Sequence, residues 1–169
     1  MAKEWACELL SRNNMSNEKI IAASIGITDY CLTIRESDSK KYEEIIEHMI
    51  ELYYSNQDEI VKNNIIFALS QLEDFVLFSR IIKSDHVDFY QKVTAVEYNV
   101  NTMLNILENN PSDQNLEVIV EAMKISPWKV IGNKIQDDMK KGIVKSNDEI
   151  EKILDLIDRE GLDLKGEIS

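Results

Sequence analysis

The chain has 169 residues, of which 31 are acidic and 19 basic, so its formal net charge is −12. A chain of this length buries roughly two thirds of the surface that its unfolded form exposes, so we expect one domain, residues 1–169, that needs no disulfide or metal to hold its core. It contains five glycines and two prolines, too few for the many turns of a β-sandwich or β-barrel. The composition therefore predicts an all-α protein.

Apolar residues recur at helical spacing along most of the chain. We expect eight or nine helices, with helical segments near 2–12, 17–34, 39–54, 56–72, 85–107, 113–126, 128–140 and 146–161. The clearest break is the segment 109–113, where paired Asn, Pro and Ser favour a turn and a new helix start. Three other helix starts are predicted from capping side chains, namely Asn56 with Glu59, Asp85, and Ser146 with Glu149. Gly142 is expected to end the helix before it.

A shift of 54 positions aligns two parts of the chain. It places Met49 on Met103, Asn56 on Asn110, Ile65 on Ile119 and Ala68 on Ala122. Both parts then consist of a helix, an Asn-marked turn and a second helix, which resembles a HEAT-like array of helical hairpins. The resemblance covers residues 16–125, followed by C-terminal helices at 126–161 and a tail at 162–169. Because 54 exceeds the usual repeat length of roughly 40–50 residues, an irregular helical bundle is the alternative.

The sequence contains no recognisable catalytic or metal-binding motif. His48 and His86 form no zinc or di-iron motif, and the glycines form no phosphate-binding loop. Cys7 and Cys31 lie among apolar residues, so we expect reduced, buried thiols. We therefore predict that the protein is not an enzyme and has no cofactor or metal, with an enzyme of unrecognised type as the least favoured reading.

No secretion signal or membrane-spanning stretch is apparent, so we expect a soluble, cytoplasmic protein. The charge is concentrated in residues 36–121, which contain 17 acidic and six basic residues, a net charge of −11. Residues 122–145 contain six basic and two acidic residues, a net charge of +4. The acidic block would repel nucleic acid and attract a basic protein. The basic segment lacks arginine and is interpreted as a solvated helix, not as a nucleic-acid site.

A small, acidic, cytoplasmic protein without catalytic residues resembles, by type, the immunity proteins of bacterial toxin systems. That resemblance implies a protein-binding inhibitor that blocks a cognate basic toxin, such as a nuclease domain, through its acidic surface. The alternative is a helical-repeat scaffold or regulatory subunit that binds a partner peptide or helix. The sequence leaves the oligomeric state open. The candidate partner-binding residues are Glu43, Glu47, Glu51, Tyr54, Asn63, Asp74, Asp85, Glu117 and Glu121.

Overall fold

The computed structural model describes residues 16–160, so the expected helix at 2–12, the thiol of Cys7 and the tail at 162–169 lie outside the described residues. Within that range the structure contains nine helices and no strands, and this confirms the all-α class and the expected number of helices. The helices are α2 (Asn17–Ile34), α3 (Ser39–Ser55), α4 (Glu59–Ser70), α5 (Phe75–Lys83), α6 (Phe89–Tyr98), α7 (Val100–Asn109), α8 (Asp113–Ile125), α9 (Lys129–Lys140) and α10 (Asp148–Glu160).

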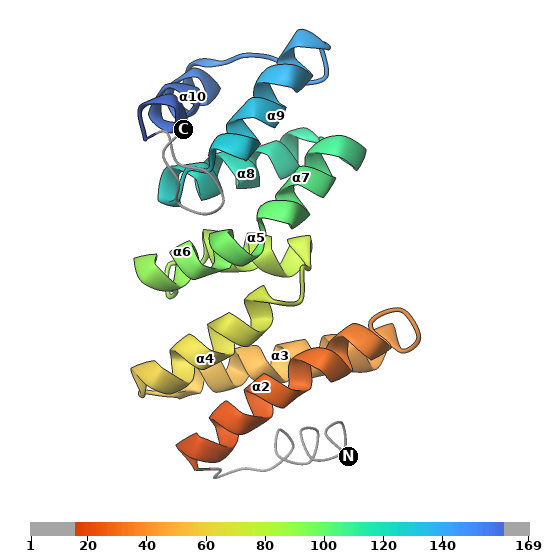
Figure 1. The fold of residues 1–169 in the computed structure, drawn as a ribbon. Helices are drawn as coiled ribbons and strands as arrows, with labels where there is room; N and C mark the ends of the chain where they lie inside the picture. Colours follow the sequence, from red (N-terminus) through yellow and green to blue (C-terminus); the bar gives the residue numbers. More distant parts are fainter. Residues whose placement is uncertain (1–15, 161–169) are drawn as a thin grey trace. The chain divides into compact units, whose positions relative to one another are not determined.

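The chain divides between Leu72 and Glu73 into two compact units. In the first unit, α2, α3 and α4 pack on one another (Figure 1). Their shared core contains Ile27, Cys31, Met49 and Ile65, each of which is almost completely buried. The thiol of Cys31 is therefore buried, as expected. The expectation that residues 1–169 form one domain stays a prediction.

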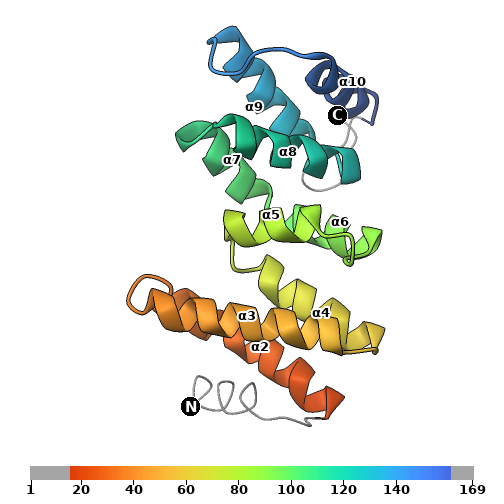
Figure 2. The same cartoon turned by 180° about the vertical axis from the view of Figure 1, so that it is seen from behind.

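In the second unit α8 contacts α5, α6, α7 and α10, and α7 contacts α5, α6, α8 and α9 (Figure 2). Two residues of α8, Ile119 and Met123, are completely buried. The helix α9 packs on α7 and α10. A Cβ atom at Gly132 of α9 would lie 3.1 Å from two side-chain carbons of Ile157 of α10. The absence of a side chain at Gly132 therefore lets these two helices approach each other closely.

The structure corrects the three helix starts that were predicted from the capping side chains of Asn56, Asp85 and Ser146. The carboxylate of Asp58, not Asn56, caps α4 by accepting hydrogen bonds from the backbone of Ile60 and Val61. Asp88, not Asp85, caps α6 in a reciprocal capping box with Gln91. For α10 the structure has Asn147 accepting from the backbone of Ile150 (2.9 Å), while the hydroxyl of Ser146 donates to Glu151. Several capping residues stand close together at these boundaries, and the pattern does not show which one the backbone uses.

The helix expected at 85–107 is in fact two helices, separated at Asn99. The side chain of Asn99 is buried and donates to the carbonyl oxygen of Ala95 (2.8 Å). Its backbone leaves the helical region, with φ −119° and ψ 16°. An Asn side chain that bonds nearby backbone in this way competes with the helix. The helix α5 was not among the predicted helices, although Leu77, Phe78 and Ile81 bury one of its faces.

In two pairs of helices, α3 with α4 and α7 with α8, the boundaries at the turn differ by the 54 residues of the sequence shift. The helix α3 ends at residue 55 and α7 at residue 109, while α4 begins at residue 59 and α8 at residue 113. In each pair the two helices pack on each other. The caps correspond as well, because Asp58 precedes α4 and Ser112 precedes α8. The HEAT-like relationship between the pairs stays a prediction.

The expected end of α9 at Gly142 is confirmed. The residue has a φ of 75°, and its backbone N–H donates to the carbonyl oxygen of Met139 (3.1 Å). The next N–H, of Ile143, donates to the carbonyl oxygen of Asp138 (2.9 Å). This pair of hydrogen bonds is the Schellman motif that commonly ends a helix. The motif fixes the direction in which the chain leaves α9 toward α10.

The change Gly142→Ala is expected to lower the free energy of unfolding by about 1 kcal/mol, because a side chain disfavours a positive φ. No atom lies within 4 Å of the added Cβ, so crowding plays no part. Urea unfolding should show a smaller loss for Gly142→Asn, since Asn tolerates this conformation better. Equal stability of Gly142→Ala and the parent protein would contradict this account of the helix end.

Candidate partner-binding surfaces

One side of α3 is acidic. The N-cap of α3 is Asp38, whose carboxylate accepts a hydrogen bond from the backbone of Lys41 (3.2 Å). Five residues on the inner side are buried, which turns the glutamates of the helix to solvent. We call the four exposed glutamates at 43, 44, 47 and 51 the α3 acidic face. It includes three of the predicted site residues, Glu43, Glu47 and Glu51.

The α3 acidic face lines a shallow hollow of about 370 Å³ together with Lys40 and His48. Among the described residues, Glu43, Glu44 and Glu51 have no ion-pair partner. Four carboxylates thus share the hollow with one lysine. Glu44 was not among the predicted partner-binding residues, although it lies one turn from His48 and Glu47 on the same helix.

Two other predicted residues belong to the same unit. Tyr54 is 53% exposed, and its ring stands edge-on to the buried ring of Tyr53, with 5.5 Å between the ring centroids. Asn63 is exposed on α4. Exposed tyrosines supply contact area at protein interfaces, so Tyr54 extends the α3 acidic face at its C-terminal end with an aromatic surface.

Asp74 and Asp85 have different surroundings in the second unit. Asp74 is the N-cap of α5, and its carboxylate accepts a hydrogen bond from the backbone of Leu77 (3.1 Å). A carboxylate at this position stabilises the start of its helix. Asp85 is exposed in the segment between α5 and α6. The structure therefore gives Asp74 a structural role and leaves Asp85 accessible.

Glu117 and Glu121 line a larger hollow in the second unit. We call this hollow, of about 660 Å³, the α8–α10 cleft, because α8, the segment 142–147 and the start of α10 form its walls. Sequence reasoning missed the other charged residues of its lining. They come from parts of the chain far apart in sequence, and they are Lys83, Asp113, Lys145 and Glu149.

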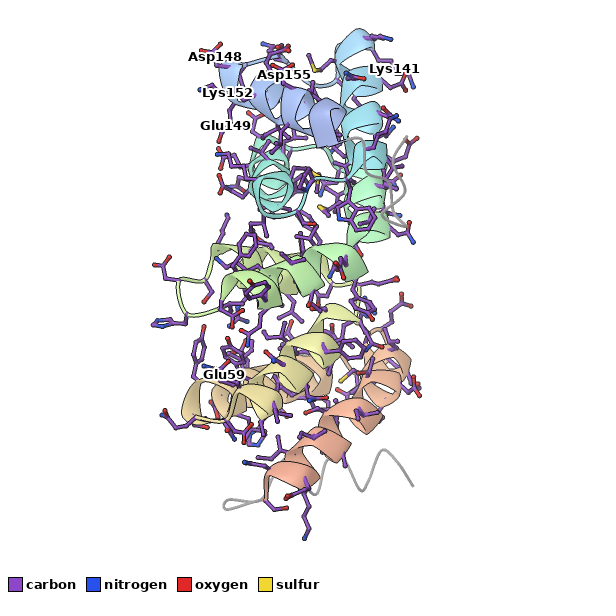
Figure 3. The ribbon with its side chains drawn as sticks, turned by 60° about the vertical axis from the view of Figure 1, so that its left-hand side comes forward. Glu59, Lys141, Asp148, Glu149, Lys152 and Asp155 are labelled. Carbon is purple, nitrogen blue, oxygen red and sulfur yellow. The ribbon has the colours of Figure 1, made fainter. Side chains whose placement is uncertain are left out.

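Three lysines of the basic segment form ion pairs. Lys124 of α8 contacts Glu121 on its own helix (3.1 Å) and Glu149 of α10. Figure 3 shows Glu149 at the same end of α10 as Asp148 and Lys152. Lys141 contacts Asp137 (3.0 Å), and their hydrogen bond lowers the pKa of Asp137. These contacts use much of the positive charge of the segment within the protein.

The third lysine, Lys134 of α9, holds two carboxylates. Its ammonium lies 2.5 Å from Glu108 of α7 and 3.1 Å from the completely buried Asp138. The hydrogen bond from Lys134 and then its charge lower the pKa of Glu108, and the same contact raises the pKa of Lys134. This ion pair joins α7 to α9.

The ion pair makes stability depend on pH. In the folded protein the pKa of Glu108 lies below its ordinary value of 4.5. The ion pair therefore stabilises the fold at pH values above 4.5, and this stabilisation is lost as the pH falls through the lowered pKa. We expect Glu108→Gln to lower the melting temperature slightly at pH near 7, with the difference from the parent shrinking at about pH 3. The control is Glu97→Gln, at an exposed α6 position that forms no ion pair with any residue the structure describes. A difference independent of pH would contradict the assignment.

Among the described residues, no group of three or more His, Cys, Asp or Glu side chains could hold a metal ion. No described helix is long and apolar enough to span a membrane. No protein-family model matches the sequence, and no curated protein or solved structure gives a significant match. The features that bear on function are therefore the α3 acidic face and the α8–α10 cleft.

Proposed function

We propose that this protein is a protein-binding inhibitor, specifically an immunity protein that binds a cognate basic toxin of nuclease type through the α3 acidic face. The observation that carries the proposal is the row of exposed glutamates along one helix, three of them without an ion-pair partner among the described residues. In this proposal the protein catalyses no reaction. It binds the toxin in the cytoplasm.

The spacing of the glutamates supports binding to a positively charged cleft. Glu43, Glu47 and Glu51 follow one another every four residues, which is about 6 Å along the helix axis. Such a row of negative charge resembles the row of phosphates that a nuclease binds. It would accelerate the encounter with a basic protein and occupy the cleft that otherwise receives nucleic acid.

The aromatic end of the face supports affinity as well as attraction. Surface charges chiefly raise the association rate, whereas buried aromatic contacts slow dissociation. Tyr54 lies one turn beyond Glu51 and is more than half exposed. In the proposed complex the glutamates steer the partner and Tyr54 becomes buried against it.

The test is a double charge reversal, Glu47→Arg with Glu51→Arg, against the basic nuclease-type toxin domain that the proposal expects to be encoded beside this gene. We expect association about tenfold slower at roughly 50 mM salt and a smaller effect at roughly 500 mM, because salt screens exposed charges. The matched control is Asp29→Arg with Glu97→Arg, which changes the net charge equally at exposed positions outside the α3 acidic face.

Three results would count against the proposal. They are equal association rates for the double reversal and the control, binding to the toxin domain that salt does not weaken, and a genomic neighbourhood without any toxin gene. The last result would favour the alternative of a helical scaffold that binds a peptide. The α8–α10 cleft is the observation that favours this alternative, because it is a concave surface formed by several helices.

A further inference from the structure

The α8–α10 cleft has fixed walls. Gly142 turns the chain out of α9 through its Schellman motif, and Val144 is buried, which anchors the segment that follows. The opposite wall is formed by α8. An ion-pair bridge through Lys124 then holds α8 and α10 together at Glu121 and Glu149. The volume of about 660 Å³ falls within the range of roughly 300–1,000 Å³ that is typical of ligand sites.

The carboxylates on α8 form a line. Asp113, Glu117 and Glu121 are spaced four residues apart and all line the cleft. They span about 12 Å of helix, which corresponds to three or four residues of an extended peptide at about 3.3 Å each. Glu121 is already paired with Lys124, whereas Asp113 and Glu117 have no ion-pair partner among the described residues. The open negative charge therefore lies at the Asp113 end of the cleft.

Apolar side chains lie between and opposite these carboxylates. Leu116 and Val120 of α8 and Ile150 of α10 belong to the lining, and Ile143 is 48% exposed at the same cleft. The cleft thus offers apolar contact beside a carboxylate. Arginine and lysine fit such a surface, because their aliphatic stems bury against apolar groups while their charged ends bind carboxylates.

The remaining charges limit what can bind. Lys124 pairs with two of the four carboxylates that line the cleft, Glu121 and Glu149. The two that remain, Asp113 and Glu117, would repel a phosphate or nucleotide from their end of the cleft, and the other charges of the lining are Lys83 and Lys145. The two lysines form no ion pair with described residues, so a polycation would meet repulsion as well. The lining suits a ligand with a single positive charge between apolar groups.

We propose that the α8–α10 cleft binds a short extended peptide segment with one arginine or lysine between apolar residues. The basic side chain lies between Asp113 and Glu117, and its apolar neighbours pack on Leu116, Val120 and Ile143. This binding needs no part of the α3 acidic face, so it goes beyond the proposed function and can be tested separately from it.

The probe is the tripeptide Leu-Arg-Leu, acetylated and amidated at its ends, titrated into the full chain by calorimetry and by NMR. We expect amide shifts within 113–121 and 142–150. Glu117→Gln should weaken binding about tenfold, as expected for the loss of one charge-assisted hydrogen bond. Glu97→Gln, an exposed glutamate of the same unit outside the cleft, should leave binding unchanged. The neutral tripeptide Leu-Gln-Leu should bind about tenfold more weakly than Leu-Arg-Leu.

Equal affinity of the parent and Glu117→Gln, or no binding at millimolar peptide, would overturn the assignment. Loss of tripeptide binding in the Glu47→Arg, Glu51→Arg variant would also overturn it, because the peptide would then be using the α3 acidic face. Tripeptide binding that persists while the toxin domain fails to bind would refute the proposed function and leave the cleft assignment standing.

Discussion

Side-chain oxygens at helix N-termini are the interaction on which this fold depends. An α-helix leaves its first backbone N–H groups without partners, and a chain with only five glycines and two prolines has few other means of starting and stopping helices. Seven described helices begin at a Ser, Asp or Asn that accepts such an N–H. These residues are Ser16, Asp38, Asp58, Asp74, Asp88, Ser112 and Asn147.

Capping also explains how the acidic charge is divided. Four aspartates of the acidic block serve as caps, where each carboxylate interacts favourably with the positive end of its helix. Glu108 and Glu121 pair with lysines of the basic segment. Of the acidic charge that remains for a partner, the α3 acidic face is one group and the carboxylates of α8 that line the cleft are another. Other exposed carboxylates, such as Asp85 and Glu97, belong to neither group. Net charge alone therefore overstates the acidic surface that is available to one partner.

The features that could be predicted from the sequence are ones that depend on residues close together in the chain. The bounds of α2, the break at 109–113 and the helix end at Gly142 follow from local propensity and match the structure. The start of α6 was misplaced because Asp85 and Asp88 are both competent caps. The break at Asn99 was missed because Asn is tolerated within helices, and its effect here depends on the burial of its side chain.

The same distinction applies to the candidate sites. The α3 acidic face was predictable, since residues four apart on one helix share a side. The α8–α10 cleft was not, because it joins residues near 113–121 to residues near 142–150 through the packing of α10 on α8 and α9. Glu117 and Glu121 were selected as acidic residues, without any indication that they face a hollow.

The interruption at Asn99 has a consequence for the relationship between the two helical hairpins. The helix α3 has 17 residues, whereas α7, its counterpart under the 54-residue shift, has 10. The difference of seven residues corresponds to about two helical turns, or roughly 10 Å. The first helix of the first hairpin is therefore longer than its counterpart, and the α3 acidic face occupies the middle of that longer helix. The buried amide of Asn99 thus makes the first helices of the two hairpins unequal in length. The two hairpins therefore offer a partner surfaces of different length, although each consists of a helix, a turn and a second helix.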